Sequence, residues 1–231
     1  MLDWKFIGET ILTTAQGIPV TLKLVLVSLL ISAPLAFGMA IVNLKTKSVW
    51  SKIFRIYISF VRSLPVLVII FLLYYSLPLL LAALIKKLEL PYNIYDLDPM
   101  VYGYLVFSFI STPTLSEVFR AGLLSVPVIQ KEAAQSIGMT KGQMYFYIIL
   151  PQAVEAVLPV LCTFVTNLIK MTSLAFCMSI REITGQARVA AADSIRYVEC
   201  YVVIFVMYLI LCMGTERIFR YFEQRRRLCL K

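Results

Sequence analysis

The chain has 231 residues, of which 60% are hydrophobic and only 15% are charged. Its mean hydropathy of +0.84 lies far above that of a soluble domain, so the composition indicates a protein of the lipid bilayer. The chain contains no histidine and its five cysteines show no metal-ligand spacing, which excludes metal catalysis and histidine-dependent nucleophilic triads.

The apolar runs predict an all-α membrane protein with about five transmembrane helices, because a lipid-exposed backbone must satisfy its own hydrogen bonds. The first residues, MLDWKFIGE, carry acids rather than a basic region, so the first run is expected to be a retained span and not a cleaved signal peptide. No linker divides residues 1–231, which are expected to form one transmembrane domain. The expected spans are residues 18–43, 55–84, 100–119, 144–169 and 197–220.

Lysine and arginine are distributed unequally between the two sets of connecting segments. One set holds 13 of these residues and the other holds 6, so the positive-inside rule predicts an external N-terminus and a cytoplasmic C-terminus. This topology also accounts for the net charge of +9, and no nucleic-acid partner is expected, because no basic patch is interleaved with stacking aromatics. The richer set comprises residues 43–55, 120–141 and 217–231, and the poorer set residues 1–22, 86–98 and 181–199.

A polar, glycine-marked segment, EAAQSIGMTKGQMYFYIILPQA, begins at Glu132 between the third and fourth spans. Ala133, Ala134 and Ile137 provide small and apolar contacts at helical spacing, as does Met144, so the segment is expected to form a short cytoplasmic helix that presents a compact surface. Gly138 would end this helix or let another backbone approach closely. A solvated loop helix without a partner is the alternative.

The spacing of Glu132-Ala133-Ala134, Gly138 and Ile148-Ile149-Leu150-Pro151 resembles the EAA motif in permease subunits of ATP-binding-cassette (ABC) importers. In that family the EAA helix sits in a groove of a separate ATPase subunit and carries its closure to the membrane helices. The resemblance implies a coupling region at residues 128–153. Its implied ATPase-coupling residues are Glu132, Ala133, Ala134, Gly138, Leu150 and Pro151.

Further matches extend over residues 21–222 and resemble the polar amino-acid branch of these permeases, which implies the type I importer permease fold. They include Arg62-Ser63-Leu64-Pro65, Tyr74-Tyr75, Glu117 with Arg120-Ala121-Gly122, and Lys170-Met171-Thr172-Ser173-Leu174. Three positions depart from the family pattern, namely Ser63, Ile129 and Met171, the last of which replaces an aspartate. These departures weaken the transfer of substrate contacts more than the transfer of the coupling role.

Arg62 and Glu117 are predicted to lie at similar depth, near the cytoplasmic ends of antiparallel spans. A buried charge is costly in lipid, so each is expected to find a partner or a water-filled cavity. The two can pair as a staple between spans or as an inner gate, and Arg120, three residues after Glu117, is a competing partner.

A series of polar residues recurs at helical spacing from Thr163 to Ser173 and is expected to share one helix face. It can form hydrogen bonds between helices, or it can line a hydrophilic path in which Lys170 attracts a substrate carboxylate. The series comprises Thr163, Thr166, Asn167, Lys170 and Ser173. The candidate substrate-pathway residues are Arg62, Glu117, Thr163, Asn167, Lys170, Thr172 and Ser173.

No phosphate-binding loop occurs in the sequence, so the energy for transport must come from another chain. The resemblance implies a non-catalytic permease subunit of a bacterial cytoplasmic-membrane importer. Its implied partners are ABC ATPases that bind ATP-Mg, a second identical or related permease copy, and an extracytoplasmic binding protein; this chain itself would hold no cofactor. The expected substrate is a polar amino acid, with L-cystine favoured by the Lys-x-Thr-Ser-Leu-Ala-Phe run.

Two rival functions come from other classes. A self-contained channel or ion-driven carrier for small polar solutes is disfavoured, because five spans show no inverted repeat of equal halves. A membrane enzyme is disfavoured by the lack of a nucleophile with an adjacent base.

Overall fold

The computed structural model describes residues 3–45, 48–89, 94–192 and 195–229, without the side chains of residues 95 and 226–229. These residues form helices and connecting turns with no strand, which confirms the all-α prediction. The α-helices are α1 (Trp4–Ala15), α2 (Gly17–Leu44), α3 (Val49–Ser63), α4 (Val66–Lys87), α5 (Pro99–Ser125), α6 (Val128–Ser136), α7 (Lys141–Met144), α8 (Leu150–Met171), α9 (Ile183–Ala192) and α10 (Tyr197–Cys229). Short helical turns of other types are η1 (Ile94–Asp96), η2 (Tyr145–Ile149) and η3 (Thr172–Met178).

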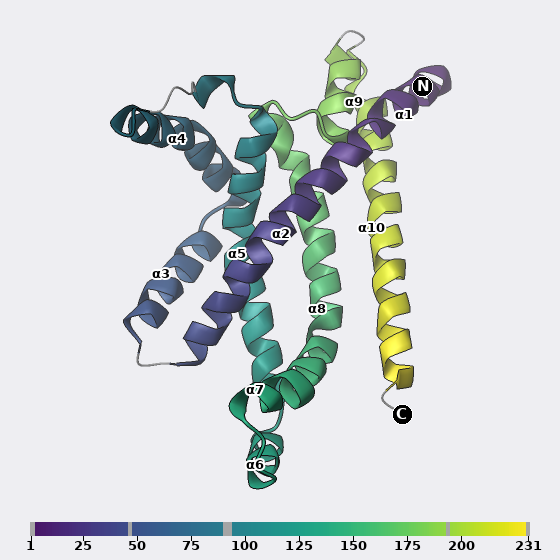
Figure 1. Cartoon of the computed structure of the whole chain (residues 1–231). Coiled ribbons are helices and arrows are strands. Elements are labelled where there is room, and N and C mark those ends of the chain that lie inside the picture. Colours follow the sequence, from purple (N-terminus) through teal and green to yellow (C-terminus); the bar gives the residue numbers. More distant parts are fainter. Residues whose placement is uncertain (1–2, 46–47, 90–93, 193–194, 230–231) are drawn as a thin grey trace.

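The long helices form a bundle in which α5 packs against both α2 and α8, and α8 packs against α10 (Figure 1). The centre of the main cluster includes Leu24 of α2 and Val106 and Phe107 of α5, whose side chains are fully buried. Serine side chains also lie at the contact of α2 and α5, and the Ser108 hydroxyl donates to the Ser28 carbonyl oxygen at 3.3 Å. This bond satisfies a polar group that lipid could not.

Four segments of the described chain are long and apolar enough to cross a membrane: Trp4–Leu44, Val66–Lys87, Lys141–Met178 and Tyr197–Arg225. The remaining expected span, residues 100–119, corresponds to α5, which has 27 residues and therefore the length to cross. Its serine and threonine side chains lower its hydropathy, and several of them are buried in the bundle. Helix α5 is thus shielded from lipid by its neighbours.

The expected span at residues 55–84 is not one helix. Helix α3 ends at Ser63 and α4 begins at Val66, with Leu64 in an extended conformation between them. The cause is Pro65, which has no backbone N–H to donate and disfavours the helical conformation in the residue before it.

The two termini lie at opposite ends of the bundle (Figure 1). Helices α1 and α9 lie at the end that holds the N-terminus, whereas α6, α7 and the C-terminus lie at the other end. Gly122 allows α5 and α8 to approach each other near the α6 end, since a Cβ atom there would meet Cγ1 of Val157 at 2.3 Å. The segment between α5 and α8 is therefore held against closely packed helices.

Candidate functional site

Helix α6 carries the Glu-Ala-Ala sequence and has one inward and one outward face. Ala134 is 1% exposed, whereas Glu132 and Ala133 are exposed. Ile137, which was expected to make a contact together with Ala133, is also exposed. These two residues are four apart and so share the outward face, while Ala134 points to the bundle.

The C-terminus of α6 is closed by Gly138, as the sequence predicted. Gly138 has a φ of +80°, which is a left-handed conformation that side chains disfavour. Its N–H donates to the Gln135 carbonyl oxygen at 3.0 Å, and the N–H of Met139 donates to that of Ala134 at 3.1 Å. This pair of bonds is a Schellman motif, and Met139 packs near Ala134 in the same apolar cluster.

The chain then re-enters the bundle through α7 and a π-helical turn. The Thr140 and Gln143 side chains form a reciprocal capping box at the start of α7. The N–H of Leu150 bonds to the carbonyl oxygen of Tyr145, five residues earlier. This widening follows from Pro151, which has no N–H and whose ring would clash with the Tyr147 carbonyl in a regular α-helix. Leu150 is half-buried and Pro151 is exposed at this turn.

Two features attach α6 to the transmembrane helices. Ala134 belongs to a buried cluster with Leu123 of α5 and Ala153 of α8. In addition, the Nε2 atom of Gln152 donates to Oε1 of Gln130 at 2.6 Å and joins α8 to α6. This glutamine pair was not predicted from the sequence, since nothing local shows that residues 22 positions apart would meet.

A hollow of about 400 Å³ brings together three of the predicted pathway residues, Arg62, Thr163 and Asn167. It lies between the break that follows α3 and the facing sides of α5 and α8, and we call it the Arg62 hollow. No Asp or Glu is among the residues that line it, and Met171 occupies the wall where the resembled family carries an aspartate. Arg62 is exposed, and no carboxylate of the described residues forms an ion pair with it.

Glu117 does not pair with Arg62. Its Oε2 atom lies 2.7 Å from a terminal nitrogen of Arg120, and both side chains are about one-third exposed. The competing partner three residues away therefore takes the carboxylate, because one turn of α5 already places the two groups on the same face.

The polar series on α8 is divided among several hollows. Lys170 lines a second hollow of about 370 Å³ together with Tyr208, Cys212 and Glu216 of α10, which we call the Lys170 hollow. Side chains three residues apart point about 60° from each other around an α-helix, so Lys170 and Asn167 can contact different neighbouring helices. Asn167 and Lys170 therefore line different hollows, and a substrate path along this series stays a prediction.

The hydroxyls of Thr166, which belongs to the series, and of the candidate pathway residue Thr172 are bonded to backbone. The Thr166 hydroxyl donates to the Cys162 carbonyl oxygen at 3.0 Å, and the buried Thr172 hydroxyl donates to that of Ile169 at 2.6 Å. Ser173 is half-buried in η3, where the chain tightens after α8 ends. Thr166 and Thr172 thus serve the helix backbone in this structure.

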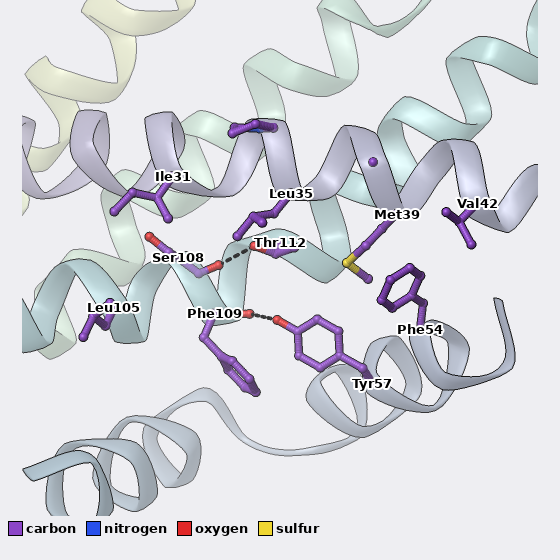
Figure 2. A pocket seen from close by; sticks show the side chains of 12 residues that line it. Ile31, Leu35, Met39, Val42, Phe54, Tyr57, Leu105, Ser108, Phe109 and Thr112 are labelled. Carbon is purple, nitrogen blue, oxygen red and sulfur yellow. Dashed lines mark hydrogen bonds between the residues drawn. The ribbon is translucent and has the colours of Figure 1, made fainter. Parts of the chain in front are cut away.

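A larger hollow of about 630 Å³ lies between α2, α3 and α5 and is almost wholly apolar (Figure 2). Its polar side chains are already bonded: the Tyr57 hydroxyl donates to the Phe109 carbonyl oxygen at 2.6 Å and the Thr112 hydroxyl to that of Ser108 at 2.7 Å (Figure 2). It offers no free polar group to an amino acid.

Glu182, which sequence reasoning also missed, joins several elements at the α9 end. Its buried carboxylate accepts the N–H of Thr184 at 2.8 Å, the N–H of Gly185 at 3.0 Å and the hydroxyl of Tyr208 at 2.8 Å. Burial raises the pKa of this carboxyl above its ordinary value, and the hydrogen bonds offset part of the rise. The available signal was an acid directly before a helix, a position that can cap free N–H groups.

The described residues contain no group of three or more His, Cys, Asp or Glu side chains that could hold a metal ion. The candidate site consists of a projecting helix at one end of the bundle together with the Arg62 hollow and the Lys170 hollow beside α8.

Comparisons with known proteins agree with this arrangement. The family model described as "Binding-protein-dependent transport system inner membrane component" matches residues 32–228. The probable amino-acid permease protein YxeN of Bacillus subtilis (strain 168) is 33% identical over 210 residues, which cover 91% of this chain and 89% of that protein. The octopine transport system permease protein OccM of Rhizobium meliloti is 34% identical over 224 residues, which cover 96% of this chain and 89% of that protein. The L-cystine transport system permease protein TcyL of Bacillus subtilis (strain 168) is 28% identical over 223 residues, which cover 96% of this chain and 91% of that protein.

Among solved structures, a crystal structure of an amino acid ABC transporter with histidines matches with a TM-score of 0.81 at 23% identity and covers 97% of this chain and 99% of that one. That likeness shows the fold, which is the type I importer permease fold expected from the sequence. The chain therefore belongs to the binding-protein-dependent transport system inner membrane components, as a multi-pass, non-catalytic permease subunit of an amino-acid ABC transporter.

Proposed function

We propose that a separate ATPase drives this permease by gripping α6. The observation that carries the proposal is the two-sided character of that helix. Ala134 and Gln130 fix it to α5 and α8, while Glu132 and Ala133 remain exposed. Large apolar side chains are also exposed beside them, including Ile129 at 70% and Ile137 at 77%. Exposed apolar groups rimmed by polar ones are typical of a protein contact.

The proposed mechanism is alternating access. Two permease copies would each present an α6 helix to a pair of ATPases, which bind ATP-Mg. ATP-driven closure would draw the α6 helices together, and the Gln130–Gln152 bond and the Ala134 cluster would pass that displacement to α8 and α5. In this proposal the α6 end is cytoplasmic, the N-terminus is external, and an external binding protein delivers the solute.

The proposed solute is a polar amino acid. Arg62 offers a cation without a carboxylate partner in its hollow, and Thr163 and Asn167 offer hydrogen-bonding groups beside it. Lys170, with Ser173 close in sequence, would attract a carboxylate on the other side of α8. L-cystine is the favoured candidate, since two relatives are named as L-cystine permeases, although octopine permeases are similarly related.

The test is uptake by proteoliposomes that contain this chain with its ATPase and binding protein. We expect accumulation of one or a few polar amino acids from a panel that includes cystine and octopine, and no accumulation when ATP is replaced by a non-hydrolysable analogue. Accumulation by the chain alone, without the ATPase, would instead support the channel or carrier.

A further inference from the structure

A third polar hollow, of about 370 Å³, lies beside α9 at the end of the bundle opposite α6 (Figure 1). Two arginines, Arg181 and Arg188, line it together with the ring of Phe176. Ser179 brings them to one place, because its left-handed backbone, with a φ of +60°, turns the chain between η3 and α9. We call this site the α9 hollow.

Within the described residues neither guanidinium group is paired with an acid, and that of Arg188 is held by an aromatic ring. The Arg188 guanidinium lies 4.4 Å from the centre of the Phe176 ring, and such stacking leaves the in-plane N–H groups free to donate. Both arginine side chains are exposed, and neither forms an ion pair within the described part of the chain. Arg196, at the same end of the bundle, differs in that it is paired with Asp3.

The acid that could have neutralised this hollow points elsewhere. Glu182 follows Arg181 directly, yet its carboxylate is buried and takes its hydrogen bonds from α9 backbone and Tyr208. Among the described residues, no Asp or Glu lines the α9 hollow. A free amino acid would place its ammonium group beside two cations there, so the hollow suits a carboxylate without a neighbouring positive charge.

The location makes unpaired arginines unexpected. In the proposed orientation this end is external, and external segments of membrane proteins are depleted in lysine and arginine. A stacking contact between Arg188 and Phe176 would explain one arginine as a brace for α9, but it would leave Arg181 without a role. Two cations in one open hollow are explained together by an anionic group that arrives from outside.

We propose that the α9 hollow docks an acidic side chain of the external binding protein, whose carboxylate is held by Arg181 and Arg188. This inference rests on the proposed function and on its orientation. Carboxylate–arginine pairs are directional and can be bidentate, so such a contact would fix the rotation of the binding protein over the permease as well as speed its association.

The test measures ATP hydrolysis by the complete transporter in nanodiscs as a function of binding-protein concentration. We expect the Arg181→Glu/Arg188→Glu double variant to raise the half-stimulating concentration by about tenfold or more, with a weaker salt dependence than the unmodified chain. Phe176→Leu keeps both charges but removes the stacking, and should give an intermediate rise. The matched control is Lys86→Glu/Lys87→Glu at the end of α4, which makes the same charge change at the same end and should leave the concentration unchanged.

Two further arms complete the experiment. Arg188→Lys, checked for folding by gel filtration, should retain most of the stimulation, because it keeps the positive charge that the carboxylate of the binding protein contacts. Equal half-stimulating concentrations for the unmodified chain and the double variant would overturn the proposal. So would an effect that appears in nanodiscs with anionic phosphatidylglycerol and vanishes in zwitterionic phosphatidylcholine, because the hollow would then hold an anionic lipid headgroup. A complex without any ATP-driven uptake would refute the proposed function instead, which keeps the two failures apart.

Discussion

Gln152 of α8 donates from Nε2 to Oε1 of Gln130 of α6 across a distance of 2.6 Å. The same Nε2 atom also donates to the Ile148 carbonyl oxygen at 3.0 Å, one turn earlier in the chain. One amide group thus connects the projecting helix to the point where the π turn gives way to α8. In the proposed mechanism, a displacement of α6 would be transmitted to α8 at this point.

Gln152→Leu removes this connection and should weaken coupling. A lost hydrogen bond of this kind is worth about 0.5–1.5 kcal/mol, so we expect insertion to be normal and the ratio of amino acid transported to ATP hydrolysed to fall several-fold. The measurement is paired uptake and phosphate release in proteoliposomes. Gln224→Leu is the control, since Gln224 is an exposed residue of α10 and lies outside the α6 surface. An equal ratio in the two variants would show that the glutamine pair transmits nothing.

Gly138→Ala tests the backbone conformation that ends α6. A Cβ at this position would meet nothing within 4 Å, so any effect must come from the φ of +80°, where a side chain costs about 1–2 kcal/mol. We expect faster amide hydrogen exchange over residues 128–139, measured by mass spectrometry, and reduced coupling. Gly142→Ala is the matched control, because its Cβ also meets nothing but its φ is not positive. If exchange in the Gly138 variant matched that of the control, the left-handed cap would be irrelevant to the stability of α6.

Local features of the coupling region could be predicted from the sequence. The end of α6 at Gly138 follows from conformational freedom at a single residue, and its position between the third and fourth spans follows from hydropathy. The break between α3 and α4 also has a local cause, Pro65. The break was not predicted, because the residues around Pro65 are apolar and form one continuous hydrophobic run. An apolar run indicates that a segment is in the membrane and does not indicate that it is one helix.

Contacts between distant segments could not be predicted in the same way. Helical spacing placed Asn167 and Lys170 on one broad arc, but which neighbour each one faces depends on where α3 and α10 pack. The bonds of Glu182 likewise depend on Tyr208, 26 residues later. Equal depth of Arg62 and Glu117 did not produce a pair, because a partner within the same helix costs less chain ordering than one on another helix.

The buried Glu182 should make the stability of the protein fall as the pH rises. It lies between the segments that can cross the membrane, and burial raises the pKa of its carboxyl above the ordinary value. Between the ordinary pKa and this raised one, the folded chain binds more protons than the unfolded chain. The contribution of Glu182 to the free energy of unfolding is therefore greatest below the ordinary pKa and is lost as pH rises through the raised one.

Glu182→Gln should remove this decline, because the amide does not ionise. The readout is the change of melting temperature between about pH 4 and pH 8 in detergent. Only the slope is compared, since the amide also turns an N–H₂ group toward one of the backbone donors and lowers stability at every pH. Glu132→Gln, on the exposed face of α6, should keep the slope of the unmodified chain. A Glu182→Gln variant with that same slope would exclude Glu182 as its origin.

Replacement by methionine should have opposite effects at Arg62 and Arg120: the change at Arg120 should lower stability, whereas the change at Arg62 should lower uptake. Arg120→Met leaves the Glu117 carboxylate without the partner that lies 2.7 Å away, so it should lower the free energy of unfolding, by about 1 kcal/mol for a partly exposed pair. Arg62→Met leaves no acid unpaired in its hollow and should keep the melting temperature. Uptake should instead fall by about tenfold or more, because the cation that we propose attracts the substrate carboxylate is gone.

Arg62→Lys separates charge from shape, since it retains the cation and loses the planar donor arrangement. We expect it to recover part of the uptake lost in Arg62→Met, mainly through the KM for the amino acid. Asn167→Leu, which removes a polar group from the same hollow, should also raise KM. If Lys170→Met reduced uptake and all three substitutions in the Arg62 hollow did not, the solute would pass on the α10 side of α8, through the hollow that Lys170 shares with Glu216.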